Sequence, residues 1–220
     1  AALSAFSDIY FKSKEKIAKN KISGQNILIF DMLKHYSRQI LKIDAAVSPL
    51  EIISLEKKYV YQKPLTGHPD KLMVRLGGRI DRIDCTSKQT RIIDYKTGKV
   101  KDRTKDIESL FLKNHPNRNN AAFQAMLYCL FYQKELKPGE SVAPGLYFLQ
   151  KLFENEFTWK LKIGERNQIT DMDNFAFYSD EFRQHLTELL IELFNPEIPF
   201  IQSDNEKICD YCQYKGICHR

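Results

Sequence analysis

The chain has 220 residues, of which 43% are hydrophobic and 28% are charged, and this composition excludes a disordered or low-complexity protein. Its net charge of +6 allows a polyanionic partner but does not by itself indicate one. No apolar run is long enough to span a bilayer and no signal peptide opens the sequence, so we expect a cytoplasmic protein that binds no membrane.

The first 50 residues have helical periodicity. Residues 1–20 place apolar side chains on one side of a helix, and residues 25–42 repeat the pattern until the Ser-Pro-Leu at 48–50 ends it. The sequence starts abruptly and without Met. We therefore interpret residues 1–50 as an N-terminal helical segment that is a truncated part of the domain that follows.

Strands are predicted next. Residues 51–61 have the composition of a strand, and residues 71–85 and 90–96 are predicted to be two strands joined in a hairpin. The connection that follows, residues 97–119, is polar and basic, which suits either a solvated loop or a segment that follows a nucleic-acid backbone. Its basic residues are Lys99, Lys101, Arg103, Lys105, Lys113 and Arg118.

The second half of the chain alternates helix and strand patterns. We predict a helix over residues 120–135, strands over 144–153 and 156–164, and a helix over 179–195 with Ser179 as its N-cap. The resulting order is two helices, three strands, a helix, two strands and a helix. This order indicates an α/β fold with a mixed central β-sheet flanked by helices.

Charged side chains interrupt the apolar strands of the hairpin. Asp94 and Lys96, in "RIIDYKTG" (residues 91–98), lie two residues apart and therefore share one face of the strand. Asp81 on the preceding strand can reach the same end of the hairpin. Two close carboxylates repel unless a cation lies between them, and Mg²⁺ accepts such ligands. A water on that ion could attack phosphorus, with Lys96 orienting it or stabilising the charge that develops.

The same charges also allow a purely structural interpretation, in which a salt-bridge cluster covers an exposed face of the sheet. The members of that cluster would be Asp81, Arg82, Asp84, Arg79 and Lys96. The apolar surroundings and the Gly77–Gly78 step favour a functional site, because glycine lets another chain or a ligand approach a strand closely.

The segment "GGRIDRID", followed by a short turn and "RIIDYKTG", resembles the PD-(D/E)XK nuclease superfamily. The likeness is closest to the RecB-like branch, found in helicase–nucleases of the AddAB type. It implies a restriction-endonuclease-like core that binds Mg²⁺ or Mn²⁺ through Asp81, Asp94 and the carbonyl of Tyr95. Lys96 would complete the site, and Asp94 stands where the superfamily often has Glu.

A second signature of that branch is Gln-x-x-x-Tyr on the helix after the hairpin, which Gln124 and Tyr128 match in "QAMLY". Residues at i and i+4 share one helix face. The resemblance directs both side chains toward the active site and the DNA strand. Without it, a core glutamine beside a core tyrosine is the simpler interpretation.

The sequence closes with a cysteine motif of spacing C-x₂-C-x₅-C, formed by Cys209, Cys212 and Cys218. Three thiols this close together in a cytosolic chain indicate metal ligands. The residues alone leave open a zinc site completed by His219 and an iron–sulfur cluster, since each needs four ligands. The resemblance favours a [4Fe–4S] cluster with one further cysteine upstream.

The remaining cysteines, Cys85 and Cys129, are predicted to be buried structural residues, and His35 is a weak match to the upstream metal-binding histidine of the family. We therefore expect the cluster in the full-length protein and not in this fragment. The predicted organisation is the helical segment, a nuclease core over residues 51–206 and a cysteine motif over residues 207–220.

The resemblance implies a metal-dependent deoxyribonuclease that acts on DNA, single-stranded at the active site. It would be the exonuclease part of a helicase–nuclease in double-strand break repair, with a helicase subunit or an upstream helicase-like region as partner. A non-catalytic DNA-binding or scaffold module that retains the fold is the alternative. The intact set of Asp81, Asp94 and Lys96 favours the enzyme.

Overall fold

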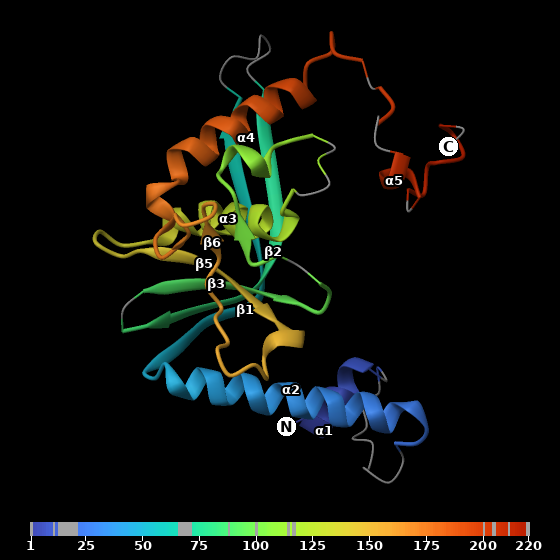
Figure 1. The fold of residues 1–220 in the computed structure, drawn as a ribbon, viewed down its shortest axis with the longest axis vertical. Helices are drawn as coiled ribbons and strands as arrows, with labels where there is room; N and C mark the ends of the chain where they lie inside the picture. Colours follow the sequence, from blue (N-terminus) through green and yellow to red (C-terminus); the bar gives the residue numbers. More distant parts are fainter. Residues whose placement is uncertain are drawn as a thin grey trace.

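A four-stranded mixed sheet is the centre of the fold (Figure 1). The computed structural model describes residues 2–10, 12, 22–65, 72–87, 89–99, 101–113, 115, 118–199, 201–203, 206–210 and 212–218. The strands are β1 (Leu50–Pro64), β2 (Met73–Thr86), β3 (Thr90–Lys96) and β5 (Val142–Phe148). In the order β1-β2-β3-β5, the first three strands are antiparallel and β5 runs parallel to β3. The predicted hairpin is therefore present as β2 and β3.

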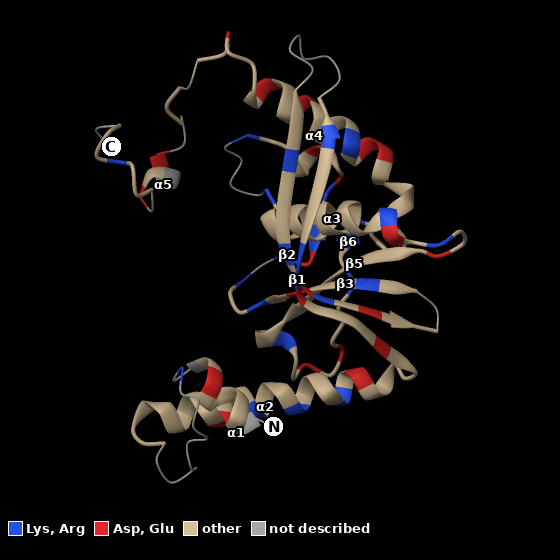
Figure 2. Cartoon of the chain, turned by 180° about the vertical axis from the view of Figure 1, so that it is seen from behind, with Lys and Arg blue, Asp and Glu red and all other residues tan. Residues whose placement is uncertain are grey.

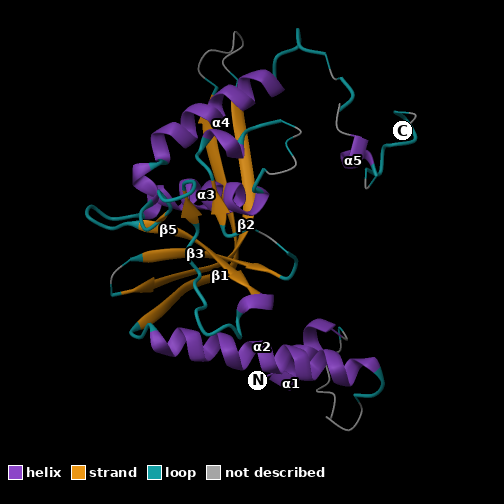
Figure 3. Cartoon of the chain, viewed as in Figure 1, coloured by secondary structure: helices purple, strands orange, loops and turns teal. Residues whose placement is uncertain are grey.

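Helices cover both faces of the sheet (Figure 3). They are α2 (Gln25–Ala46), α3 (Asn120–Tyr132) and α4 (Ser179–Leu193). On one face, Ile40 and Ile43 of α2 pack against Ile93. On the other, α3 and α4 share a larger apolar core with the sheet. The predicted α/β fold with a mixed central sheet flanked by helices is confirmed.

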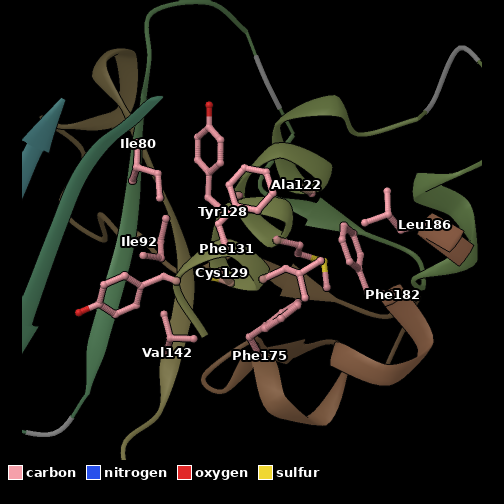
Figure 4. Packing of buried hydrophobic residues seen from close by; sticks show 14 of the residues in the cluster. Ile80, Ile92, Ala122, Tyr128, Cys129, Phe131, Val142, Phe175, Phe182 and Leu186 are labelled. Atoms are coloured by element: carbon pink, nitrogen blue, oxygen red, sulfur yellow. The ribbon is translucent and has the colours of Figure 1, made fainter. Parts of the chain in front are cut away.

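Helix α3 is the buried centre of the larger core (Figure 4). Its sequence is apolar almost all round, which is typical of a helix enclosed by other elements. Ala122 and Cys129 are fully buried and lie toward Ile80 and Ile92 of the sheet. The helix begins where the Asn119 side chain accepts a hydrogen bond from the Ala122 backbone N–H at 3.0 Å, an N-cap.

Several short elements complete the chain. A second sheet contains β4 (Arg103–Thr104), β6 (Lys162–Ile163) and β7 (Thr170–Asp171) in the order β4-β6-β7. The short helices are α1 (Ala2–Ala5), the π-helix η1 (Phe6–Tyr10), α5 (Glu206–Cys209), and the 3₁₀-helices η3 (Glu108–Leu110), η4 (Gln133–Glu135), η5 (Leu149–Lys151) and η6 (Phe175–Phe177). The predicted helix over 1–20 is described only in part, because residues 13–20 lie outside the described residues. Within the described part of the chain, no helix combines the length and apolar character needed to cross a membrane.

Three predictions of local structure are wrong. The predicted strand over 144–153 ends at Phe148, and the 3₁₀-helix η5 follows it. The predicted strand over 156–164 is a strand only at Lys162–Ile163, because Trp159 packs on Gly145 and the chain then leaves the main sheet to pair with β4. Ser179 is not an N-cap, since α4 begins at this residue. Its hydroxyl donates to the carbonyl of Ala176 at 3.1 Å instead.

The Gly77–Gly78 step receives a side chain of the same protein. A Cβ atom added at Gly78 would lie 2.6 Å from Cε1 of Tyr128. The Tyr128 ring can therefore pack on β2 only because residue 78 has no side chain. At Gly77 the nearest atom would be the carbonyl oxygen of Tyr59, at an ordinary 3.5 Å. Glycine is therefore required at one of the two positions, and for packing of α3 rather than for an external ligand.

We expect Gly78→Ala to lower the free energy of unfolding by about 1–3 kcal/mol, the usual cost of overpacking. Gly77→Ala is the matched control and should change it by less than about 0.5 kcal/mol. Urea denaturation followed by circular dichroism measures both. Equal effects of the two substitutions would contradict the conclusion that the Tyr128 ring packs directly on Gly78.

Candidate active site

One face of β3 carries the predicted catalytic charges. Ile92 lies in the core beneath α3, and the alternation of the strand brings Asp94 and Lys96 to that same face. Asp94 Oδ2 lies 2.5 Å from Lys96 Nζ and forms an ion pair with it. The Asp94 side chain is 3% exposed and that of Lys96 is 22% exposed, so the pair lies at the edge of the core, within reach of solvent.

A chain of polar contacts connects this pair to α3. Lys96 Nζ donates to Gln124 Oε1 at 2.7 Å, and Gln124 Nε2 donates to the Tyr128 hydroxyl at 2.9 Å. Gln124 and Tyr128 therefore share one helix face, as their spacing predicts. The half-buried glutamine has a partner on each side, which fixes the direction of the lysine above the strand.

Asp81 joins the group from β2. The ladder between β2 and β3 ends with the pair Arg82 and Ile93, and one residue further on Asp81 Oδ2 accepts a hydrogen bond from the Tyr95 backbone N–H at 2.9 Å. The carboxylate thus replaces a ladder partner at the end of the hairpin. Asp81, Asp94 and Lys96 converge there, although they come from two strands.

The environment disfavours ionisation of Asp94 in the absence of a cation. Burial raises the pKa of this carboxyl above its usual range, the Lys96 ammonium partly offsets that effect, and the negative charge of Asp81 raises the pKa further. Two acidic groups that repel in this way favour the binding of a cation between them.

The residues present fit a magnesium-type ion better than a metal held entirely by side chains. Asp81 and Asp94 supply two carboxylates, and the described partner of buried Asp94 Oδ2 is the Lys96 ammonium at 2.5 Å. Among the described residues, no three side chains of His, Cys, Asp or Glu are placed to hold one metal ion. Mg²⁺ suits such a site because it takes one or two carboxylates and keeps several waters.

The side chain of Tyr95 belongs to the opposite face of the sheet. Its hydroxyl accepts a hydrogen bond from Arg82 Nη1 at 3.2 Å, and its ring packs edge-on against Tyr147 at 5.5 Å. Only the backbone of Tyr95 can therefore face the carboxylates, in keeping with a ligand role assigned to its carbonyl.

Two residues of the alternative salt-bridge cluster, Arg82 and Asp84, lie on the face of the sheet opposite to Asp94 and Lys96. Asp84 accepts hydrogen bonds from Arg82 and Arg91, while Asp44 of α2 accepts two from Arg82 at 2.8 and 2.9 Å. These groups are separated from Asp94 and Lys96 by the thickness of the sheet. Arg79 pairs instead with Glu56, at 3.7 Å. The alternative of one exposed cluster is therefore wrong.

The sequence gives no signal for Asp44, which completes this network from a remote helix. Burial of Arg82 opposes its charge, but the hydrogen bonds that it donates to Asp44 help to raise the pKa of the guanidinium above its ordinary value.

The sequence also gives only part of the role of Asn119. Its place before a helical run predicts an N-cap. No local pattern predicts that its side chain also donates to the backbone carbonyls of Lys101 and Arg103.

The cysteine motif lies apart from this site. In Figure 1 the segment around α5 stands away from the sheet. Cys209, Cys212 and Cys218 are half-buried free thiols, and the described residues do not gather them into one ligand group. The metal site predicted for the three thiols is therefore not found among the described residues, and His219 lies outside them. As they stand, these residues do not fit a cluster that needs four thiolates.

The other two cysteines and His35 have structural surroundings. Cys129 is fully buried, as predicted, and burial raises the pKa of its thiol. Cys85 is only partly buried, with its thiol 3.2 Å from the Thr86 carbonyl, so the prediction that it is buried is wrong. His35 is exposed and stacks on Phe153 with ring centroids 4.4 Å apart.

Comparison with known proteins identifies the family. The sequence model of the PD-(D/E)XK nuclease superfamily matches residues 7–219, so the chain belongs to this superfamily, whose members are nucleases. The mixed sheet between helices agrees with the restriction-endonuclease-like fold of that superfamily. Among the curated proteins no match is found. A solved structure described as the crystal structure of SSO0001 aligns with 86% of this chain and 67% of its own, at 14% identity and a TM-score of 0.38.

The raised pKa of Asp94 predicts a stability gain when its charge is removed. The pKa of Asp94 is higher in the folded protein than in the unfolded chain. Ionised Asp94 therefore lowers the stability of the folded protein at a pH above its folded-state pKa. This loss of stability disappears as the pH falls through the folded-state pKa toward the unfolded-state pKa. In EDTA, Asp94→Asn should unfold at a higher temperature than wild type at about pH 7, with the gap closing toward about pH 4. Thermal melts across this range measure it, and a less stable variant at neutral pH would contradict the electrostatic argument.

Proposed function

We propose that this protein is a divalent-metal-dependent deoxyribonuclease that hydrolyses DNA phosphodiester bonds. The observation that carries the proposal is the grouping of Asp81, Asp94 and Lys96 at one end of the β2–β3 hairpin. Lys96 Nζ lies 2.5 Å from Asp94 Oδ2, and Asp81 Oδ2 accepts a hydrogen bond from the Tyr95 backbone N–H at 2.9 Å. Membership of the superfamily supplies the general activity. The repulsion between the two carboxylates favours binding of a divalent metal ion between them.

Each residue has a role that its surroundings support. Asp81 and Asp94, with the carbonyl of Tyr95, would hold Mg²⁺ or Mn²⁺, which when bound supplies a more acidic water and stabilises negative charge on phosphate. Lys96 Nζ faces the same point and would donate to the attacking water or to a phosphate oxygen. Gln124 directs Lys96 through its 2.7 Å hydrogen bond, and Tyr128 holds Gln124 in place.

We further propose that the protein is the exonuclease part of a helicase–nuclease of the AddB type. The two motifs of the RecB-like branch, "GGRIDRID…RIIDYKTG" and "QAMLY", support this assignment. It would act in the cytoplasm in double-strand break repair, on a single strand delivered by a helicase subunit or an upstream helicase-like region. A [4Fe–4S] cluster forms no part of the proposal for these 220 residues, because three separate thiols do not hold one.

Removing either metal-binding carboxylate tests the core of the proposal. Asp81→Ala and Asp94→Ala should each abolish Mg²⁺-dependent cleavage of a labelled single-stranded oligonucleotide while leaving the fold intact, because each variant removes one of the two carboxylates that would position the ion. Asp180→Ala, which removes an exposed carboxylate on α4, is the control and should cleave at the wild-type rate. Normal cleavage by both active-site variants would overturn the proposal.

Lys96 should affect the chemical step more than metal binding. We expect Lys96→Ala to lower the single-turnover cleavage rate on the order of a hundredfold, in line with other lost electrostatic stabilisers. Isothermal titration with Mn²⁺ should give nearly unchanged affinity, since the amine is not a ligand. An unchanged cleavage rate would remove Lys96 from the mechanism.

A further inference from the structure

The basic connection between β3 and α3 is held in a defined conformation. The buried side chain of Asn119 donates from Nδ2 to the carbonyl of Lys101 at 2.8 Å and to that of Arg103 at 3.1 Å. The same residue caps α3 through its Oδ1. One asparagine therefore fixes the backbone of the basic segment against the helix that carries Gln124.

Further contacts order the remainder of this segment. β4 pairs in parallel with β6, and the Gly164 backbone N–H donates to the carbonyl of Thr104 at 3.0 Å. Ser109 donates its backbone N–H to Asp106 Oδ1 at 2.8 Å, and its hydroxyl lies 3.0 Å from that of Thr104. The basic side chains thus project from an ordered backbone, which lowers the entropy lost when they bind a ligand.

Two cavities lie along this segment and share a residue. The first, of about 410 Å³, is lined by Lys96 and Gln124 of the active site together with Lys99, Lys101 and Arg118. The second, of about 500 Å³, begins again at Lys101 and is lined by Arg103, Lys105, Thr104, Ser109 and His115 among others. Basic groups therefore continue without a break from the catalytic lysine to the small sheet, and blue segments follow this connection in Figure 2.

The charge of this path is only partly compensated. Glu165 lines the second cavity, and Asp106 lies 3.9 Å from Lys105. Asp102 pairs at 3.5 Å with Lys151, which lines neither cavity. Within the described part of the chain, Lys99 and Arg103 form no ion pair. Neither cavity is lined by Phe, Tyr or Trp, and His115 is the one ring in the described linings, so the path offers mainly charge and hydrogen-bond donors.

We propose that a single nucleic-acid strand runs from the active site along these two cavities, bound by its phosphates and not by its bases. The inference rests on the proposed nuclease function and adds the route of the substrate. Lys99 and Arg118 would contact the phosphates next to the cleaved bond. Arg103 and Lys105 would contact phosphates further along. Phosphate contacts fix the register of a strand without reading its sequence, so binding along this path should be independent of sequence.

The test measures binding without cleavage. In EDTA, the anisotropy of a fluorescent 20-nucleotide single strand should show that Lys99→Gln/Arg118→Gln binds about tenfold more weakly than wild type. The slope of log affinity against log salt should fall by about 1.4, since each lost phosphate contact on a single strand contributes about 0.7. Arg103→Gln/Lys105→Gln should weaken binding of the same strand, whatever its sequence.

Lys134→Gln/Lys137→Gln is the matched control. It removes the same charge beyond the opposite end of α3, from exposed side chains, and should keep wild-type affinity and salt slope. If the control loses as much affinity as the path variants, only net charge matters and the path is wrong. Strong dependence of affinity on base sequence would also overturn it.

Cleavage of a small diester separates this inference from the proposed function. Wild type and the Lys134→Gln/Lys137→Gln control should hydrolyse bis(p-nitrophenyl) phosphate with Mn²⁺ at the same rate, because such a substrate reaches only the active site. If wild type cleaves the diester and DNA but the path variants bind DNA normally, the route fails and the nuclease stands. If wild type cleaves neither substrate, the proposed function fails.

Discussion

The buried ion network around Asp84 is the interaction on which the remainder of the structure depends. Asp84 is fully buried and accepts hydrogen bonds from Arg82 on its own strand and Arg91 on β3, while Asp44 brings α2 onto Arg82. Loss of one partner of a buried pair leaves an uncompensated charge and costs about 3–5 kcal/mol. The network therefore fixes the hairpin and its covering helix, and with them the strands that carry the active site.

The two faces of the hairpin use charge in opposite ways. Behind the sheet, two arginines and two aspartates balance, and the Tyr95 and Tyr147 hydroxyls take part in the same network. On the front, two carboxylates face a single lysine, and the pKa of Asp94 is raised. A cluster whose charges balance stabilises a fold, whereas an excess of carboxylates favours the binding of a cation. The alternation of side chains along one strand keeps the two sets apart.

Helix α3 links the core, the catalytic group and the basic path. Its buried residues fill the core, Gln124 and Tyr128 direct Lys96, and Asn119 at its start holds the connection that carries the cations. Gly78 lets the helix approach β2 closely enough for this arrangement. A shift of α3 along the sheet would therefore disturb the candidate site and the basic connection together.

The sequence by itself determined the features that depend on near neighbours. Alternation along β3 places Asp94 beside Lys96, and helical spacing places Gln124 beside Tyr128, because local geometry alone sets which side chains share a face. Only the tertiary structure decided that Asp44 neutralises Arg82, that Gly78 receives Tyr128, that Arg82 and Asp84 lie behind the sheet, and that 156–164 leaves it. These depend on packing between segments far apart in the chain, for which the sequence carries no local pattern.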